Sequence, residues 1–286
     1  MLVPAWQTSG TELGQDAFVR IAALLLLVAC AGTPDGDSDD PIDQPEDGEQ
    51  IVLDDGKADG SLWTSIGLGV VYQRQNTGDA VVIAYGGYTA RIVDSASWAS
   101  ELVDARLGGE GVGHVYAVKG PADAAYAARE IANTKLRASL PAGASKIYIV
   151  AHSSGAFVAH ELLQQLKTRG DADTLARIAY ANLDGGGSGL STAIVESLGG
   201  IAFVSARDPA VGESRNASTM RANASTYGMP WYEVVVPSTN CISTWCLHDV
   251  VITEKPHNPN SFDLARDYGD FVNRNVTTKY FDVFAQ

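Results

Sequence analysis

The most constraining feature of the chain is the stretch 147–157, which reads IYIVAHSSGAF. Its first four residues are β-branched or aromatic, which is typical of a buried strand. A helix-like spacing of apolar residues follows, at Phe157, Leu162, Leu163 and Leu166. A strand that turns straight into a helix at Ser153 brings two backbones together, so the residues two positions away must be small. Ala151 and Gly155 meet that requirement.

Such a turn holds the Ser153 hydroxyl above the end of the sheet and directs the backbone N–H of Ser154 toward the same space. The stretch resembles the nucleophile elbow of the α/β-hydrolase family, in the Ala-x-Ser-x-Gly form that some bacterial lipases use. The resemblance implies that Ser153 is a nucleophile and that Ser154 helps to bind an oxyanion. The alternative is a plain turn whose serines cap the helix.

Strand and helix patterns alternate along residues 61–286. Besides the strand at 147–152, strands are predicted at 66–74, 80–85, 115–118, 177–183, 200–206 and 232–236. Helices are predicted at 94–107, 121–139, 191–198, 214–227 and 261–272, besides the one after Ser153. Strands that are apolar on both faces and alternate with helices predict an α/β fold, with a mostly parallel central sheet and helices on both faces.

The family resemblance adds two expectations to this fold class. The sheet should be of the α/β-hydrolase type, and any lid should enter after the strand at 177–183. Only residues 184–199 are available there, so we expect little or no lid.

A serine becomes a nucleophile when a histidine takes its proton and a carboxylate orients that histidine. The family order is serine, acid, histidine. Two histidines follow the predicted elbow helix, and His248 comes after the strand at 232–236, where the family places its base. His257 precedes the last helix and is the alternative base. The other three histidines are expected to be structural or surface residues: His114, His152 and His160.

Two aspartates can supply the acid. Asp208 follows the strand at 200–206, at the usual family position, and we expect it to orient His248. Asp184 ends the preceding strand and is the alternative acid, since some hydrolases place the acid one strand earlier. Either aspartate could instead bond its own backbone in a turn, which is common before glycine or proline.

A second oxyanion donor is expected from the loop after the strand at 80–85. Two glycines there let a backbone N–H approach a ligand closely, and Gly87 or Tyr88 would donate. We predict no metal, because no histidines are paired at i, i+4 and no thiols cluster. No P-loop or dinucleotide fingerprint appears, so we predict no cofactor.

The amino-terminal part is predicted to be a signal and a tether. Residues 21–29 are apolar and too short to span a bilayer, which fits a secretory signal. The ending LVAC resembles a bacterial lipobox, which implies that residues 1–30 are a lipoprotein signal segment and that Cys30 is lipidated. Residues 31–60 are predicted to be a disordered linker, because residues 35–59 contain eleven acidic residues and a single lysine.

Export of a lipoprotein has two further consequences. With Cys30 lipidated, Cys241 and Cys246 are the remaining thiols, and they are expected to form a disulfide. The protein is expected in the outer membrane or at the cell surface, held by its lipid anchor.

The net charge of −14 is concentrated in the linker, and no basic cluster indicates nucleic acid binding. The resemblance therefore implies an exported, lipid-anchored serine hydrolase that cleaves carboxylic esters, lipid or polymeric ones included, through an acyl-enzyme. The alternatives are an acyltransferase with the same triad and a non-catalytic surface-binding lipoprotein on the same fold.

Overall fold

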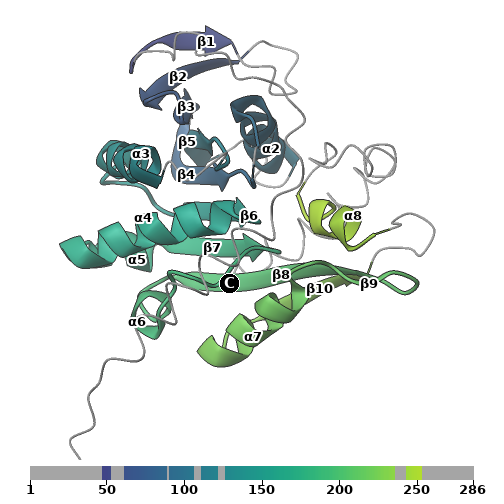
Figure 1. Cartoon of the computed structure of the whole chain (residues 1–286). Helices are drawn as coiled ribbons and strands as arrows, with labels where there is room; N and C mark the ends of the chain where they lie inside the picture. Colours follow the sequence, from purple (N-terminus) through teal and green to yellow (C-terminus); the bar gives the residue numbers. More distant parts are fainter. Residues whose placement is uncertain are drawn as a thin grey trace, which may run out of the picture. The chain divides into compact units, whose positions relative to one another are not determined.

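The computed structural model describes residues 47–52, 61–88, 90–105, 111–121, 126–235 and 243–252. These residues contain a ten-stranded sheet with the order β1-β2-β3-β5-β4-β6-β7-β8-β10, and β9 pairs with β8 alone (Figure 1). Within the described part, no helix has both the length and the apolar character needed to cross a membrane.

The six strands from β5 to β10 along this order are mutually parallel. Their bounds are β5 Gly111–Val118, β4 Gly78–Tyr85, β6 Ile147–His152, β7 Ile178–Leu183, β8 Gly200–Asp208 and β10 Trp231–Val235. Antiparallel pairs occur at one edge and beside β8, in β1 Gln50–Val52, β2 Leu62–Gly67, β3 Val71–Gln75 and β9 Gly212–Glu213. Because parallel strands end together, residues that follow β4, β6 and β7 lie at one end of the sheet.

Two separate apolar clusters pack against the two faces of the sheet. One cluster includes α2 Ile92–Ala105 and α8 Thr244–Asp249. The other includes α3 Tyr126–Ser139, α4 Gly155–Arg169, α5 Ala172–Ala176, α6 Thr192–Val195 and α7 Ala217–Tyr227. The predicted fold class is therefore confirmed: a mostly parallel central sheet with helices on both faces. Between β7 and β8, residues 184–199 hold only the four-residue helix α6.

The first strand prediction was wrong in one respect. Residues 66–74 do not form a single strand, because the chain reverses between β2 and β3. Leu68 and Gly69 both have positive φ, at 54° and 68°, and Val70 N donates to the carbonyl of Gly67 at 2.9 Å. Two successive left-handed residues are the signature of a tight hairpin turn.

The sheet also begins earlier than expected. Strand β1 lies inside the stretch 31–60 that was predicted to be a disordered linker, and it pairs antiparallel with β2. Ile51 packs against the core, whereas its strand neighbours Gln50 and Val52 are exposed, as expected of an edge strand. Cys30, Cys241, His257 and the helix predicted at 261–272 lie outside the described residues.

Candidate active site

The sharp strand-to-helix turn predicted at Ser153 is present. Strand β6 ends at His152, helix α4 begins at Gly155, and Ser153 between them has φ +54°. This left-handed backbone is uncommon for a residue with a side chain and costs on the order of 1–3 kcal/mol. A Cβ atom added to Gly155 would lie 2.3 Å from the carbonyl oxygen of Gly86, so only glycine fits there.

His248 and an aspartate form a buried pair at this end of the sheet. His248 Nδ1 donates to Asp184 Oδ2 at 2.6 Å, and both side chains are almost fully buried. His248 lies on α8, one turn in from its start. Its ring centroid is 4.5 Å from that of His152, the residue before Ser153, so the pair lies beside the turn.

The prediction that Asp208 orients His248 was wrong, and the alternative acid Asp184 is the partner. Strand β8 does not end at residue 206 but continues through Asp208 and pairs there with β9. Asp208 Oδ1 accepts from the backbone N–H groups of Ala210 and Val211, at 2.6 Å and 3.1 Å. This carboxylate therefore holds the hairpin turn, which was the simpler reading left open for both aspartates.

Sequence reasoning missed two residues that hold Asp184. Ser214 Oγ donates to Asp184 Oδ1 at 2.7 Å, and the backbone N–H of Asn216 donates to Oδ2 at 3.3 Å. The Asn216 side chain also donates to the backbone carbonyl of Asp184 at 2.7 Å. The Asp-Pro pair at 208–209, followed by Gly212, is a hairpin signal that would have returned residues 213–216 toward the preceding strand.

The loop after β4 passes directly over the turn at Ser153. A Cβ atom added to Gly87 would lie 3.1 Å from Cβ of Ser153 and 2.8 Å from Nδ1 of His152. Gly87 therefore lies against the turn that carries Ser153. Tyr88 is partly exposed, at 42% of its surface.

Among the described residues, Ser153 Oγ makes no hydrogen bond to His248. Ser153 is half-buried, and its backbone N–H donates to the carbonyl of Leu183 at 3.2 Å. Hydrogen bonds between a nucleophile and its base often form only when substrate binds, so the lack of this bond does not exclude Ser153 as the nucleophile.

His160 has a structural role, as expected. It is buried on α4, its Nδ1 donates to the carbonyl of Ser188 at 2.7 Å, and its Nε2 accepts from Tyr180 Oη at 2.9 Å. Burial lowers the pKa of His160 to about 4, although the bond to Ser188 works in the opposite direction. A histidine that stays neutral in this way serves packing and hydrogen bonding.

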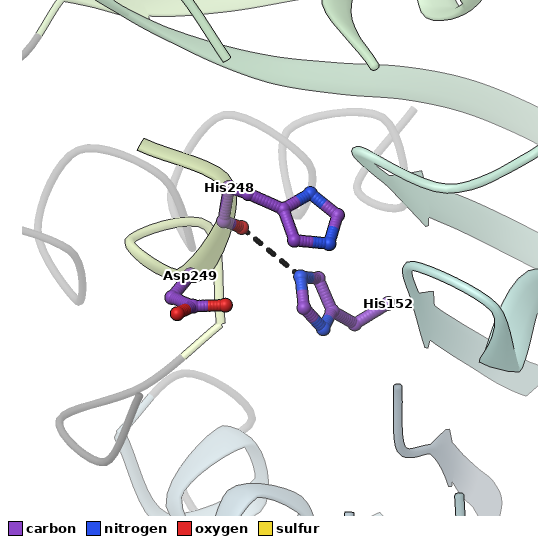
Figure 2. A group of neighbouring side chains, drawn as sticks. All are labelled: His152, His248 and Asp249. Carbon is purple, nitrogen blue, oxygen red and sulfur yellow. Dashed lines mark hydrogen bonds between the residues drawn. The ribbon is translucent and has the colours of Figure 1, made fainter. Parts of the chain in front are cut away.

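Three buried side chains beside the turn could hold a metal ion: His152, His248 and Asp249 (Figure 2). They offer ligand atoms within 4.8 Å of one another, and two imidazoles with one carboxylate suit Zn²⁺. Both rings are already oriented by hydrogen bonds, since His152 Nε2 donates to the carbonyl of His248 at 3.0 Å and His248 donates to Asp184. A metal bound by His248 Nε2 would occupy the nitrogen that a serine nucleophile needs.

No family model matches the chain, and no curated protein matches it significantly. Several solved structures resemble it at low identity. The ester hydrolase EH1AB1 from the metagenome of Lake Arreo is 15% identical, with 85% of this chain and 86% of that one covered and a TM-score of 0.48. A fungal esterase from Rhizomucor miehei is 13% identical, with 97% and 93% covered and a TM-score of 0.45.

The esterase EstE5, which was soaked with p-nitrophenyl butyrate, is 11% identical to this chain. The likeness covers 89% of this chain and 97% of that one, at a TM-score of 0.45. These likenesses assign no role to any residue of this chain.

Proposed function

We propose that the chain is a serine hydrolase that cleaves carboxylic esters through an acyl-enzyme. The observation that carries this proposal is the buried bond of 2.6 Å between His248 Nδ1 and Asp184 Oδ2, beside a serine with φ +54° at a strand-to-helix turn. A structural serine has no need of a strained backbone, and a buried imidazole–carboxylate pair next to it supplies the base and its orienting acid.

Each residue has one task in this mechanism. Ser153 Oγ attacks the ester carbonyl while His248 Nε2 takes its proton, and the alcohol leaves with that proton. Asp184 keeps the proton of His248 on Nδ1 and stabilises the imidazolium. The N–H groups of Ser154 and of Gly87 or Tyr88 bind the oxyanion. Water then attacks the acyl-enzyme by the same route and releases the acid.

The test is covalent labelling by a fluorophosphonate probe together with turnover of p-nitrophenyl esters. Wild type should label and turn over, and Ser153→Ala should do neither while it keeps the fold by circular dichroism. Ser145→Ala is the matched control, because Ser145 lies before β6 and its hydroxyl bonds Asp79 on the surface. Full ester turnover by Ser153→Ala would sink the proposal.

The cluster in Figure 2 favours one second candidate, a metal-dependent hydrolase that uses His152, His248 and Asp249. The two mechanisms respond oppositely to metal. A serine hydrolase should keep its turnover after dialysis against a chelator and lose it in excess Zn²⁺, which would bind His248. Turnover that disappears with the chelator and returns with Zn²⁺ would favour the metal enzyme.

The short segment between β7 and β8 bears on substrate size. Residues 184–199 form turns and a four-residue helix, and no long insertion enters there. We expect activity on bulky, lipid or polymeric esters as well as on small ones. Adding an alcohol acceptor and analysing the products separates hydrolysis from acyl transfer.

We also propose that the protein is an exported lipoprotein anchored through Cys30, which rests on the sequence alone. Cys30→Ala should release the protein from the membrane fraction or block its processing. A variant that fractionates and migrates like wild type would contradict the anchor.

A disulfide between Cys241 and Cys246 is the remaining proposal. Cys246 is buried in α8, two residues before His248, so a bridge would fix the start of the helix that presents the base. Both thiols should resist alkylation in the native exported protein until it is reduced. Ready alkylation without reductant would exclude the bridge.

A further inference from the structure

Residues Ser214, Arg215 and Asn216 connect β9 to α7; they contact Asp184 directly and are linked to His248 through Trp245. Ser214 Oγ donates to Asp184 Oδ1 at 2.7 Å, and the Asn216 backbone N–H donates to Oδ2 at 3.3 Å. Each carboxylate oxygen therefore accepts a hydrogen bond from this segment. Oδ2 also accepts the hydrogen bond from His248. Rotation of the carboxylate would break at least two of these bonds.

The hydroxyl of Ser214 is itself fixed. Its Oγ accepts from the backbone N–H of Ala206 at 3.2 Å, and its own backbone N–H donates to the carbonyl of Ala206 at 2.8 Å. A hydroxyl has a single proton to donate, and with Ala206 occupying an acceptor site that proton goes to Asp184. Ser214 is almost fully buried, so water does not compete for it.

The backbone of Asp184 needs support as well, because its φ is +45°. Residues with a side chain seldom adopt this conformation, although aspartate tolerates it better than most. The Asn216 side-chain amide donates to the carbonyl of Asp184 at 2.7 Å, and the backbone N–H of Asp184 donates to the carbonyl of Val204 at 2.7 Å. Both sides of the residue are therefore tied down.

Arg215 is linked to His248 through the aromatic ring of Trp245. The guanidinium of Arg215 lies 4.0 Å from the ring centroid of Trp245. The Trp245 ring meets the His248 ring edge-on, with centroids 5.7 Å apart and planes at 81°. The same three-residue segment thus limits the motion of His248 from the solvent side, where Arg215 and Trp245 are both exposed.

We propose that residues 214–216 are the positioning element of the Asp184–His248 pair, with Ser214 and Asn216 as positioning residues for the acid. The proposal rests on the proposed ester hydrolysis for its effect on rate. The Ser214 hydroxyl and the Asn216 backbone N–H keep the Asp184 carboxylate facing His248 Nδ1, and the Asn216 side chain holds the Asp184 backbone. Arg215 keeps the Trp245 ring against the His248 ring.

Ser214→Ala is the main test, and Ser214→Thr is the conservative variant that keeps the hydroxyl. A hydrogen bond to a charged group corresponds to about a tenfold change in rate or more, so kcat of Ser214→Ala should fall about tenfold at little-changed KM. Ser214→Thr should recover most of the loss. Ser145→Ala removes a serine–aspartate bond elsewhere on the chain and should leave kcat at the wild-type value.

Two further measurements separate positioning from a merely structural role. The acid limb of the pH profile of kcat/KM should shift in Ser214→Ala, and the Nδ1 signal of His248 in spectra of ¹⁵N-histidine-labelled protein should move. Asn216→Ala is the second variant if Ser214→Ala does not fold, and it should move the same signal. An Nδ1 signal that stays at its wild-type position in the folded variants would overturn the proposal.

The Nδ1 signal also separates the two proposals. If wild type neither labels with the probe nor turns over esters, the proposed function fails, yet a moved signal still shows that residues 214–216 position the pair. If wild type is active and the signal and kcat are both unchanged in the variants, only the positioning proposal fails.

Discussion

Asp184 and Asp208 come from equivalent places in the fold and do different things. Each lies at the carboxyl end of one of two neighbouring parallel strands, and each is fully buried. Asp184 accepts a bond from His248, whereas Asp208 accepts from the backbone of its own turn. A position at a strand end therefore does not by itself place a carboxylate in the site. The path of the chain after the aspartate decides which groups the carboxylate meets.

The chain takes different paths at the two aspartates because β7 ends before Asp184, whereas β8 continues through Asp208. Strand β7 stops at Leu183, and Asp184 leaves the sheet with φ +45°. Strand β8 runs through Asp208 and returns as β9, so Asp208 stays within a hairpin. The hairpin is what brings Ser214 back to Asp184, and the two aspartates therefore cooperate: one belongs to the site, and the other shapes the segment that holds it.

A double-mutant cycle on turnover should show the largest difference between the two aspartates. Asp184→Asn and His248→Ala should each lower kcat by about 10⁴-fold, and the double variant should be little worse than either, because these residues act as one unit. Asp208→Asn combined with His248→Ala should simply reproduce the His248→Ala value. A cycle in which the Asp208 variant is the non-additive one would transfer the role of acid to that residue.

The turn role of Asp208 should show as a modest effect on stability. Asp208→Ala removes the acceptor of two backbone N–H groups and should lower the free energy of unfolding by about 1–2 kcal/mol, as measured by urea denaturation. Asp208→Asn keeps an acceptor oxygen at the turn and should stay near wild type. Among the described residues Oδ2 of Asp208 has no hydrogen-bond partner, so an amide there breaks no bond. Equal losses in both variants would contradict the turn role.

The buried side chain of His160 makes the stability of the protein depend on pH. His160 has a pKa of about 4 when folded against 6.5 as its usual value, so below pH 6.5 the unfolded chain binds the proton more readily. Its contribution to stability is complete above pH 6.5 and is lost as the pH falls toward 4, about 2 kcal/mol by pH 5.

His160→Gln should therefore narrow the difference in unfolding free energy between pH 7 and pH 5, measured by denaturant titration. An unchanged difference in unfolding free energy would show that His160 is not the titrating group.

Much of this site follows from local sequence patterns. The turn at Ser153 was predictable because small residues two positions on either side permit the close approach that Gly155 makes to Gly86. His248 was predictable from its place after the strand at 232–236. The turn depends on a short stretch of chain whose strand and helix patterns are visible in the sequence. The place of His248 followed from the resemblance to a family with the order serine, acid, histidine.

The acid was not predictable from the same patterns. Asp184 and Asp208 both follow buried strands, and the choice depends on where β8 ends and on Ser214 and Asn216, which lie some 30 residues from Asp184 in sequence. Strand ends are the least certain part of a sequence-based prediction. The extension of β8 by two residues moved Asp208 from the site into a turn.

The most direct test measures kcat/KM for Asp184→Asn and Asp208→Asn side by side on one p-nitrophenyl ester, with folding checked by circular dichroism. Asp184→Asn should lose about 10⁴-fold, because the amide favours the wrong histidine tautomer. Asp208→Asn should stay within about threefold of wild type, since its partners are backbone groups of its own turn. A severe loss in Asp208→Asn with an active Asp184→Asn would contradict the assignment of Asp184 as the acid that orients His248.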